Sequence, residues 1–143
     1  MVLDFANSSH DHNPLHVDPE FAAATPYKYC IAHGMLVASF ISGMLSTEIP
    51  GYGTVFVDLN DVKFERPVFV GSEVDVELRV SHLLGLHKSG KWGQVMFEAE
   101  ARLRSVPQEA LDMGVPNHTG KVVLLATARV LAPLRQPVLA RVA

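Results

Sequence analysis

The chain has 143 residues, of which 48% are hydrophobic and 19% are charged, and its formal net charge at pH 7 is −3. This length and composition allow one domain with an ordinary apolar core, so we expect a single domain over residues 1–143. Acidic and basic residues are interspersed, without the basic stripe that neutralises nucleic-acid phosphates. The balance of charge therefore argues against a nucleic-acid-binding protein.

Neither end of the sequence resembles a targeting signal. The amino terminus carries the acidic Asp4 and no basic-then-apolar leader, and residues 141–143 are no standard peroxisomal signal. The longest apolar run, residues 31–45, is interrupted by polar residues and is shorter than the roughly 20 residues of a membrane span. Cys30 is the only cysteine, which excludes an internal disulfide and fits a reducing compartment. We expect a protein of the cytosol or of an organellar matrix, without membrane contact.

Two helices are expected in the first third of the chain. Asp18 followed by Pro19 is typical of a helix N-cap and first helical position, and it starts a short helix over residues 21–24. From about residue 32 to residue 46, apolar side chains cover most of the circumference of a second, longer helix. We expect this second helix to be buried on nearly all sides.

The remainder of the chain alternates apolar and polar residues, the pattern of strands with one buried face. The alternating segments are residues 55–60, 73–80, 95–104 and, after a long loop that contains proline and glycine, 121–131. Turns at Val70-Gly71-Ser72 and around residues 88–93 predict that these strands form an antiparallel meander. One long helix packed on one face of such a sheet is an α+β architecture.

The expected sheet leaves edge strands whose backbone groups have no neighbour. Pairing two such edges across a two-fold axis would cover them, so we expect a homodimer or a higher oligomer. A monomer with charged edges is the alternative.

The densest polar segment of the sequence is residues 9–18. Asn13 precedes a proline, which favours an extended backbone, and Pro14 fixes its own φ near about −65°, so the chain should turn here. Such a turn can bring Asp11 and His16 to one pocket, where a carboxylate and an imidazole can hold one water molecule between them. This arrangement suits the addition of water to a double bond, because one group takes a proton from the water while the other gives a proton to the neighbouring carbon.

The same segment resembles a known family. Its pattern Asp11-x-Asn13-Pro14-x-His16-x-Asp18 is similar to the signature of the MaoC-like dehydratases, which include the (R)-specific enoyl-CoA hydratases. The resemblance covers residues 5–80 and continues through Pro19-Glu20-Phe21-Ala22, Ile31-Ala32-His33-Gly34-Met35-Leu36, Ala38-Ser39, Ser42-Gly43 and Phe64-x-x-Pro67-Val68-Phe69-Val70-Gly71. The combination of the first segment with His-Gly-Met-Leu is the specific part of the match.

The resemblance implies a hot-dog fold, in which the sheet wraps around the long central helix, and a hydro-lyase acting on acyl thioesters of fatty-acid metabolism. By this resemblance Asp11 and His16 are the catalytic dyad that adds water to a trans-2-enoyl thioester, or removes it from an (R)-3-hydroxyacyl thioester. The backbone N–H of Gly34 would bind the thioester carbonyl oxygen. A helix start suits that role, because its free N–H groups and the helix dipole favour negative charge.

Further residues are candidates for orienting the dyad or contacting the substrate. The resemblance places Ser42 beside the dyad, although a serine inside a buried helix usually bonds to its own backbone. Asn13 and Asp18 are interpreted mainly as a turn former and a helix cap, and Asn13 is kept as a candidate. His33 lies next to the expected oxyanion donor, and either contacts the substrate or bonds to nearby backbone.

No metal or cofactor is expected beyond the coenzyme A or acyl-carrier-protein pantetheine that the substrate itself carries, and Arg66, Lys88 and Lys91 are candidates for binding its phosphates. One alternative is a 3-hydroxyacyl-[acyl-carrier-protein] dehydratase with the same chemistry. A hot-dog acyl-CoA thioesterase is another, and a metal-dependent hydrolase is a third, because residues 10–18 contain zinc-ligand residue types. Such a zinc site would also need a distant ligand.

A non-catalytic acyl-CoA-binding subunit is the last alternative, and two departures from the family pattern keep it open. His10 stands where the family usually has glycine. Family members also generally have a first strand ahead of Phe5, so the sheet is expected to lack that strand.

Overall fold

The structure is a computed structural model, and it describes residues 1–134; the sequence expectation for residues 141–143 falls outside that range. The helices are α1 (Val2–Ser9), α2 (Pro14–Val17), α3 (Pro19–Ala23), α4 (Gly34–Thr47) and α5 (Gln108–Asp112). The strands are β1 (Val55–Phe64), β2 (Glu73–Leu86), β3 (Trp92–Ser105) and β4 (Val122–Pro133). Helix α5 lies in the segment for which proline and glycine predict only a loop.

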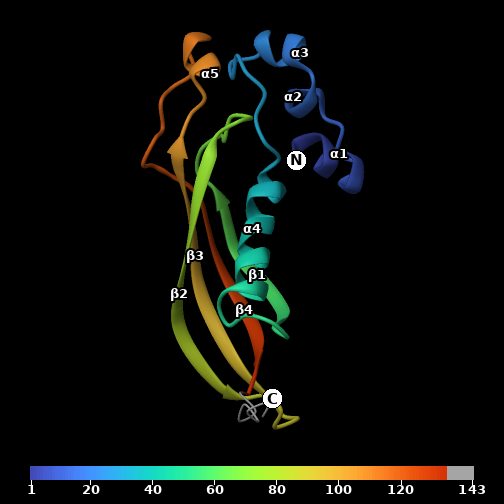
Figure 1. Cartoon of the computed structure of the whole chain (residues 1–143), viewed down its shortest axis with the longest axis vertical. Helices are drawn as coiled ribbons and strands as arrows, with labels where there is room; N and C mark the ends of the chain where they lie inside the picture. The colour runs from blue at the N-terminus through green and yellow to red at the C-terminus, as the bar shows by residue number, and fades with distance from the viewer. Residues whose placement is uncertain (135–143) are drawn as a thin grey trace, which may run out of the picture.

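The four strands form one antiparallel sheet in the order β1-β4-β3-β2, which curves along one side of α4 (Figure 1). The expected α+β architecture is therefore confirmed. The expected meander is wrong for β1, because β1 and β2 lie at opposite edges of the sheet rather than side by side. Only β2, β3 and β4 follow one another as neighbours.

The segment between β1 and β2 crosses from one edge of the sheet to the other instead of turning back. It is held by backbone pairing with the residues that precede α4. Ala32 N–H donates to the Val68 carbonyl at 2.7 Å, and Val70 N–H donates to the Cys30 carbonyl at 2.9 Å. Because Val68 and Val70 pair with the segment before α4, the Val70-Gly71-Ser72 turn leads into β2 without joining two neighbouring strands as a hairpin.

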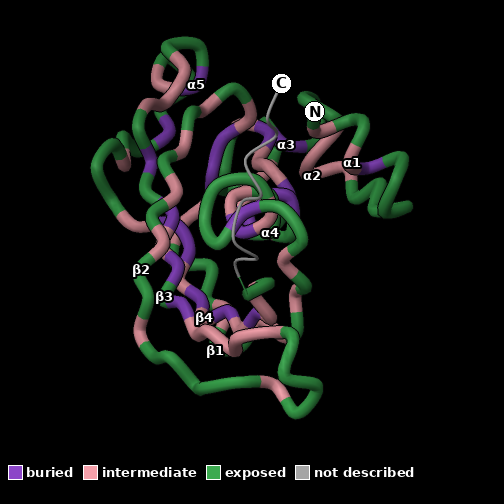
Figure 2. The backbone as a smooth tube through the Cα atoms, turned by 60° about the horizontal axis from the view of Figure 1, so that its bottom comes forward, coloured by how far each residue is buried: buried purple, intermediate pink, exposed green. Residues whose placement is uncertain are grey.

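Helix α4 buries one face against the sheet. Its buried residues are Leu36, Val37, Ala38, Ile41 and Leu45, and they pack on Phe97, Leu124 and neighbouring apolar side chains of the sheet. The opposite face, which includes Ser39, Ser42 and Gly43, is exposed, as the burial colours in Figure 2 show along the helix. The expectation of a helix buried on nearly all sides is wrong for the single chain, because one curved sheet covers only one side of the helix.

The helix start that Asp18 predicts is confirmed. Its carboxylate accepts hydrogen bonds from the backbone N–H groups of Glu20 and Phe21 at 3.0 and 3.1 Å, which caps α3. The expected turn after Asn13 is the four-residue helix α2. Within residues 1–134, no helix is both long and apolar enough to cross a bilayer.

The two faces of α4 differ in what they contribute to stability. Ile41 is fully buried, so Ile41→Ala should lower the free energy of unfolding by about 2–5 kcal/mol through lost burial and a residual cavity. Ser39→Ala, on the exposed face two residues earlier, should change it by less than about 0.5 kcal/mol. Urea denaturation of both variants measures the difference, and equal effects would contradict the assigned packing face.

Candidate active site

The loop that carries Asp11 begins where α1 ends in a left-handed residue. His10 has φ 60° and ψ 19°, a conformation that glycine adopts without strain. The loop then continues through two side-chain bonds to backbone: Asp11 Oδ1 accepts from Asn13 N–H at 3.2 Å, and Asn13 Oδ1 accepts from Leu15 N–H at 3.1 Å. Asn13 is the N-cap of α2, so its observed contacts are those of a turn former.

His16 lies in α2 and is oriented by the chain segment that leads into α4. Its Nδ1 is 2.7 Å from the Ile31 carbonyl oxygen, while Ile31 N–H donates to the Leu15 carbonyl at 3.3 Å. Because a carbonyl oxygen can only accept, the geometry assigns the proton to Nδ1. In the neutral ring, Nε2 then carries the free lone pair that a general base needs.

Gly34 begins α4 and lines the same pocket as Asp11 and His16, a cavity of about 470 Å³. Its N–H has no acceptor among the described residues, as expected at a helix start. A Cβ at this position would lie 2.8 Å from the Phe64 ring, so glycine also makes room for an aromatic side chain of the pocket wall. The sequence pattern predicts a free donor at Gly34, but it contains no signal for the contact with Phe64.

Three side chains converge at the base of this pocket. One ligand-type atom from each of Asp11, His16 and His33 lies within 4.8 Å of the others. No direct hydrogen bond joins the Asp11 and His16 side chains in the described part of the chain, and a separation of this size suits one bridging water. His33 is 2% exposed, whereas Asp11 is open to solvent in the single chain.

The same three side chains are the only group in residues 1–134 with the composition and spacing of a metal site. His33 would supply the distant ligand that the sequence segment alone lacks. However, the rings of His16 and His33 are stacked, with centroids 3.9 Å apart and 32° between their planes. A tetrahedral zinc site would need the lone pairs of both rings to point at one ion.

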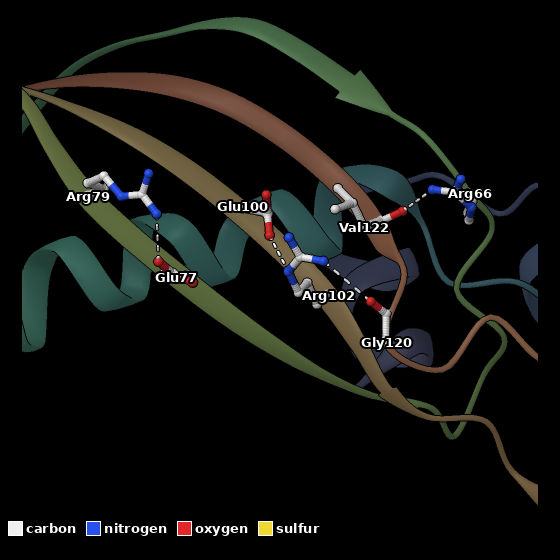
Figure 3. A network of polar contacts seen from close by, with 7 residues as sticks. All are labelled: Arg66, Glu77, Arg79, Glu100, Arg102, Gly120 and Val122. Carbon is white, nitrogen blue, oxygen red and sulfur yellow. Dashed lines mark hydrogen bonds and ion pairs between the residues drawn. The ribbon is translucent and has the colours of Figure 1, made fainter.

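Of the other candidate residues, Ser42, Lys88 and Lys91 lie outside the pocket and Arg66 lines it. Ser42 is exposed two turns along α4, about 12 Å from Gly34 at the usual helical rise, and is not part of the pocket wall. Lys88 and Lys91 belong to the β2–β3 hairpin, at the end of the sheet away from α1, α2 and α3 (Figure 1). Arg66 does line the pocket, and its Nη1 donates to the Val122 carbonyl at 2.7 Å (Figure 3).

Comparison of the sequence with known proteins identifies a family and several relatives. Residues 1–98 match the family of MaoC-like domains. An (R)-specific enoyl-CoA hydratase from Aeromonas caviae is 48% identical over 82 residues, which are 57% of this chain and 60% of that enzyme. A 3-hydroxybutyryl-CoA dehydratase from Methylorubrum extorquens is 32% identical over 118 residues, which are 78% of this chain and 74% of that enzyme.

Solved structures agree with the fold. The (R)-hydratase from A. caviae involved in PHA biosynthesis has a TM-score of 0.73 and 34% identity, over 92% of this chain and 85% of that one. An R-hydratase from Pseudomonas aeruginosa in the unliganded form has a TM-score of 0.73 and 31% identity, over 99% of this chain and 81% of that one.

The close approach of Phe64 to Gly34 can be tested by a double-mutant cycle. Gly34→Ala should lower the free energy of unfolding by about 1 kcal/mol, because the new methyl group overlaps the half-exposed ring, which must shift. In a Phe64→Ala background the same change should be neutral or stabilising. Urea titration of the four proteins gives the coupling, and additive effects would contradict the contact.

Proposed function

The chain belongs to the family of MaoC-like domains, and on this premise we propose that it is an (R)-specific 2-enoyl-CoA hydratase. The proposed reaction is the reversible addition of water to a trans-2-enoyl thioester, which gives an (R)-3-hydroxyacyl thioester. The observation that carries the proposal is the placement of Asp11 and His16 within 4.8 Å of each other, at a distance that one water can bridge.

In the proposed hydration, His16 Nε2 takes a proton from the bridging water as the water oxygen bonds to C3. The Asp11 carboxylate holds the water by accepting its other hydrogen. Hydrogen bonding of Nδ1 to the Ile31 carbonyl keeps the ring in the required tautomer and orientation. The electron pair of the C2–C3 double bond moves toward the thioester oxygen, and C2 then receives the proton that His16 took from the water, which returns both side chains to their starting state.

Gly34 has the proposed role of binding the enolate oxygen that develops in this reaction. Its N–H lacks an acceptor within residues 1–134 and stands at the positive end of the α4 dipole. A preorganised donor of this kind typically contributes about 10²–10³-fold in kcat. The dehydration of the 3-hydroxyacyl thioester passes through the same enolate, so the donor serves both directions.

The carrier of the acyl group is coenzyme A in this proposal, and the pantetheine of an acyl carrier protein is the alternative. Arg66 is the one permanently charged base among the residues that line the pocket. Arginine binds phosphate groups through several N–H donors, and both carriers contain phosphate. An assay of enoyl thioesters on both carriers separates a hydratase from a 3-hydroxyacyl-[acyl-carrier-protein] dehydratase.

We also propose a homodimer formed through the free edge of β1. Val55, Val57 and Phe64 of this strand are 46%, 44% and 52% exposed, and Phe64 lines the pocket. Pairing of two β1 edges would cover these side chains and place a second copy beside the site. The exposed face of α4, which includes Ser42, would lie near the same interface.

The proposed dyad predicts the loss of activity in two variants. Asp11→Asn and His16→Ala should each lower kcat on crotonyl-CoA by about 10²–10⁴-fold, because each removes one partner of the water. Loss of the absorbance of the conjugated thioester measures the reaction, and chiral analysis identifies the (R) product. His12→Ala is the matched control: His12 is an exposed histidine of the same loop outside the pocket, and its variant should keep full activity.

The same assay distinguishes the alternatives. Unchanged turnover in either dyad variant would refute the dyad. Release of free thiol from saturated acyl-CoA would favour a thioesterase, and binding of acyl-CoA without turnover of any enoyl thioester would favour a non-catalytic subunit. Stoichiometric zinc with EDTA-sensitive activity would favour a metal-dependent hydrolase.

The proposed dimer predicts different effects for the two edges of the sheet. Val57→Lys should give a monomer, because it places a charge in the apolar edge that the second copy would cover. Leu83→Lys, at a 78% exposed position of β2 on the opposite edge, should leave the dimer intact. Light scattering after size exclusion measures the mass, and a monomeric wild-type protein would rule out the dimer.

A further inference from the structure

We propose that His33 is a positioning residue that holds both members of the dyad in place; this inference rests on the proposed function. His33 is a polar residue inside the protein, with 2% of its surface exposed. Its Nε2 is 2.9 Å from the backbone carbonyl oxygen of Asp11. Its ring stacks on that of His16 with centroids 3.9 Å apart.

The hydrogen bond of His33 fixes the loop of Asp11 from outside that loop. A carbonyl oxygen only accepts, so Nε2 carries the proton and donates a hydrogen bond to the Asp11 backbone carbonyl. The other bonds of Asp11 are to Ser9 and Asn13, both within two residues, and they shape the loop without tying it to the rest of the fold. In the described chain, His33 provides the side-chain bond from the start of α4 to this backbone.

The ring of His33 also limits the movement of His16. One face of the imidazole of His16 rests on His33, while its Nδ1 is held by Ile31. Phe5 of α1 also packs against His33, with ring centroids 5.0 Å apart. The bond to Ile31 and the stack together leave the ring of His16 little freedom to rotate away from the water.

His33 connects this pair to the donor at Gly34 as well. It is the N-cap residue of α4, and its carbonyl oxygen accepts from Leu36 and Val37 N–H at 3.1 and 3.3 Å. One residue therefore joins the carboxylate loop, the imidazole and the helix start that carries the free N–H. A shift of His33 would change all three positions relative to one another.

The second ring nitrogen of His33 indicates that the position is not a simple packing site. Nδ1 is buried and has no hydrogen-bond partner among the described residues. Burial of an unpaired polar atom is unfavourable, and an apolar aromatic ring would fill the same space without that cost. The presence of a histidine at this position is thus explained by the hydrogen bond that its Nε2–H donates to the Asp11 carbonyl. His33 has no free, accessible donor for the substrate, so its role is positioning rather than proton transfer.

The test compares three substitutions at this position. His33→Phe keeps the stacked ring and loses the donor, and it should lower kcat on crotonyl-CoA by about 10²-fold with little change in KM, the effect of a misplacement near 1 Å. His33→Gln places an amide N–H near the position of Nε2 and should recover most of that loss. If His33→Phe does not fold, His33→Leu replaces it in the comparison. Equal activity of wild type and the Phe or Leu variant would overturn the proposal.

Two further measurements separate positioning from general destabilisation and from a failure of the proposed function. Leu103→Ala is the control, because Leu103 is 1% exposed in β3 and lies outside the pocket. This variant should lose as much melting temperature as the His33 variants but keep the kcat of the wild type. In a crystal structure of the Phe or Leu variant, the carboxylate oxygens of Asp11 should lie farther than 4.8 Å from the ring nitrogens of His16. An unchanged separation would overturn the positioning role even if the wild type hydrates no enoyl thioester.

Discussion

A helix packed on a sheet can bury its apolar face, but it cannot bury its first turn without partners for the free N–H groups there. In this protein the side of α4 that contains Ile41 and Leu45 lies on the curved sheet, and the N–H of Gly34 at its start stays without an acceptor in the described chain. The start of α4 therefore keeps a polar group beside the apolar helix–sheet contact, and the pocket lies at this helix start. The location of the site follows from how the central helix is buried.

Main-chain carbonyl groups set the geometry of the side chains in this pocket. The carbonyl of Ile31 orients His16, and the carbonyl of Asp11 accepts a hydrogen bond from His33 Nε2–H. A backbone carbonyl has a fixed position once the fold is formed and does not ionise, so it defines which nitrogen of a neutral imidazole ring carries the proton. The proposed chemistry of Asp11 and His16 thus depends on segments that themselves take no part in the reaction.

Local features of the fold are predictable from the sequence, as are the neighbours β2, β3 and β4, but the place of β1 in the sheet is not. The cap at Asp18 is confirmed, and the four alternating segments are strands, because these signals act over a few residues. Alternation gives the buried face of a strand but not its partner, so the place of β1 at the far edge is not predictable from it. The contacts of Ile31 and Asp11 with the two histidines involve backbone atoms, which every residue type carries, and so leave no mark in the sequence.

The crossing of the segment between β1 and β2 makes the pocket a composite of distant parts of the chain. Its walls include Asp11 and His16 near the beginning, Phe64 from the end of β1, Val68 from the crossing segment, and Val123 from β4. Contacts of such large sequence separation form late in folding, because the entropy of closing the intervening loops must be overcome first. During synthesis, the pocket is complete only after β4 has left the ribosome.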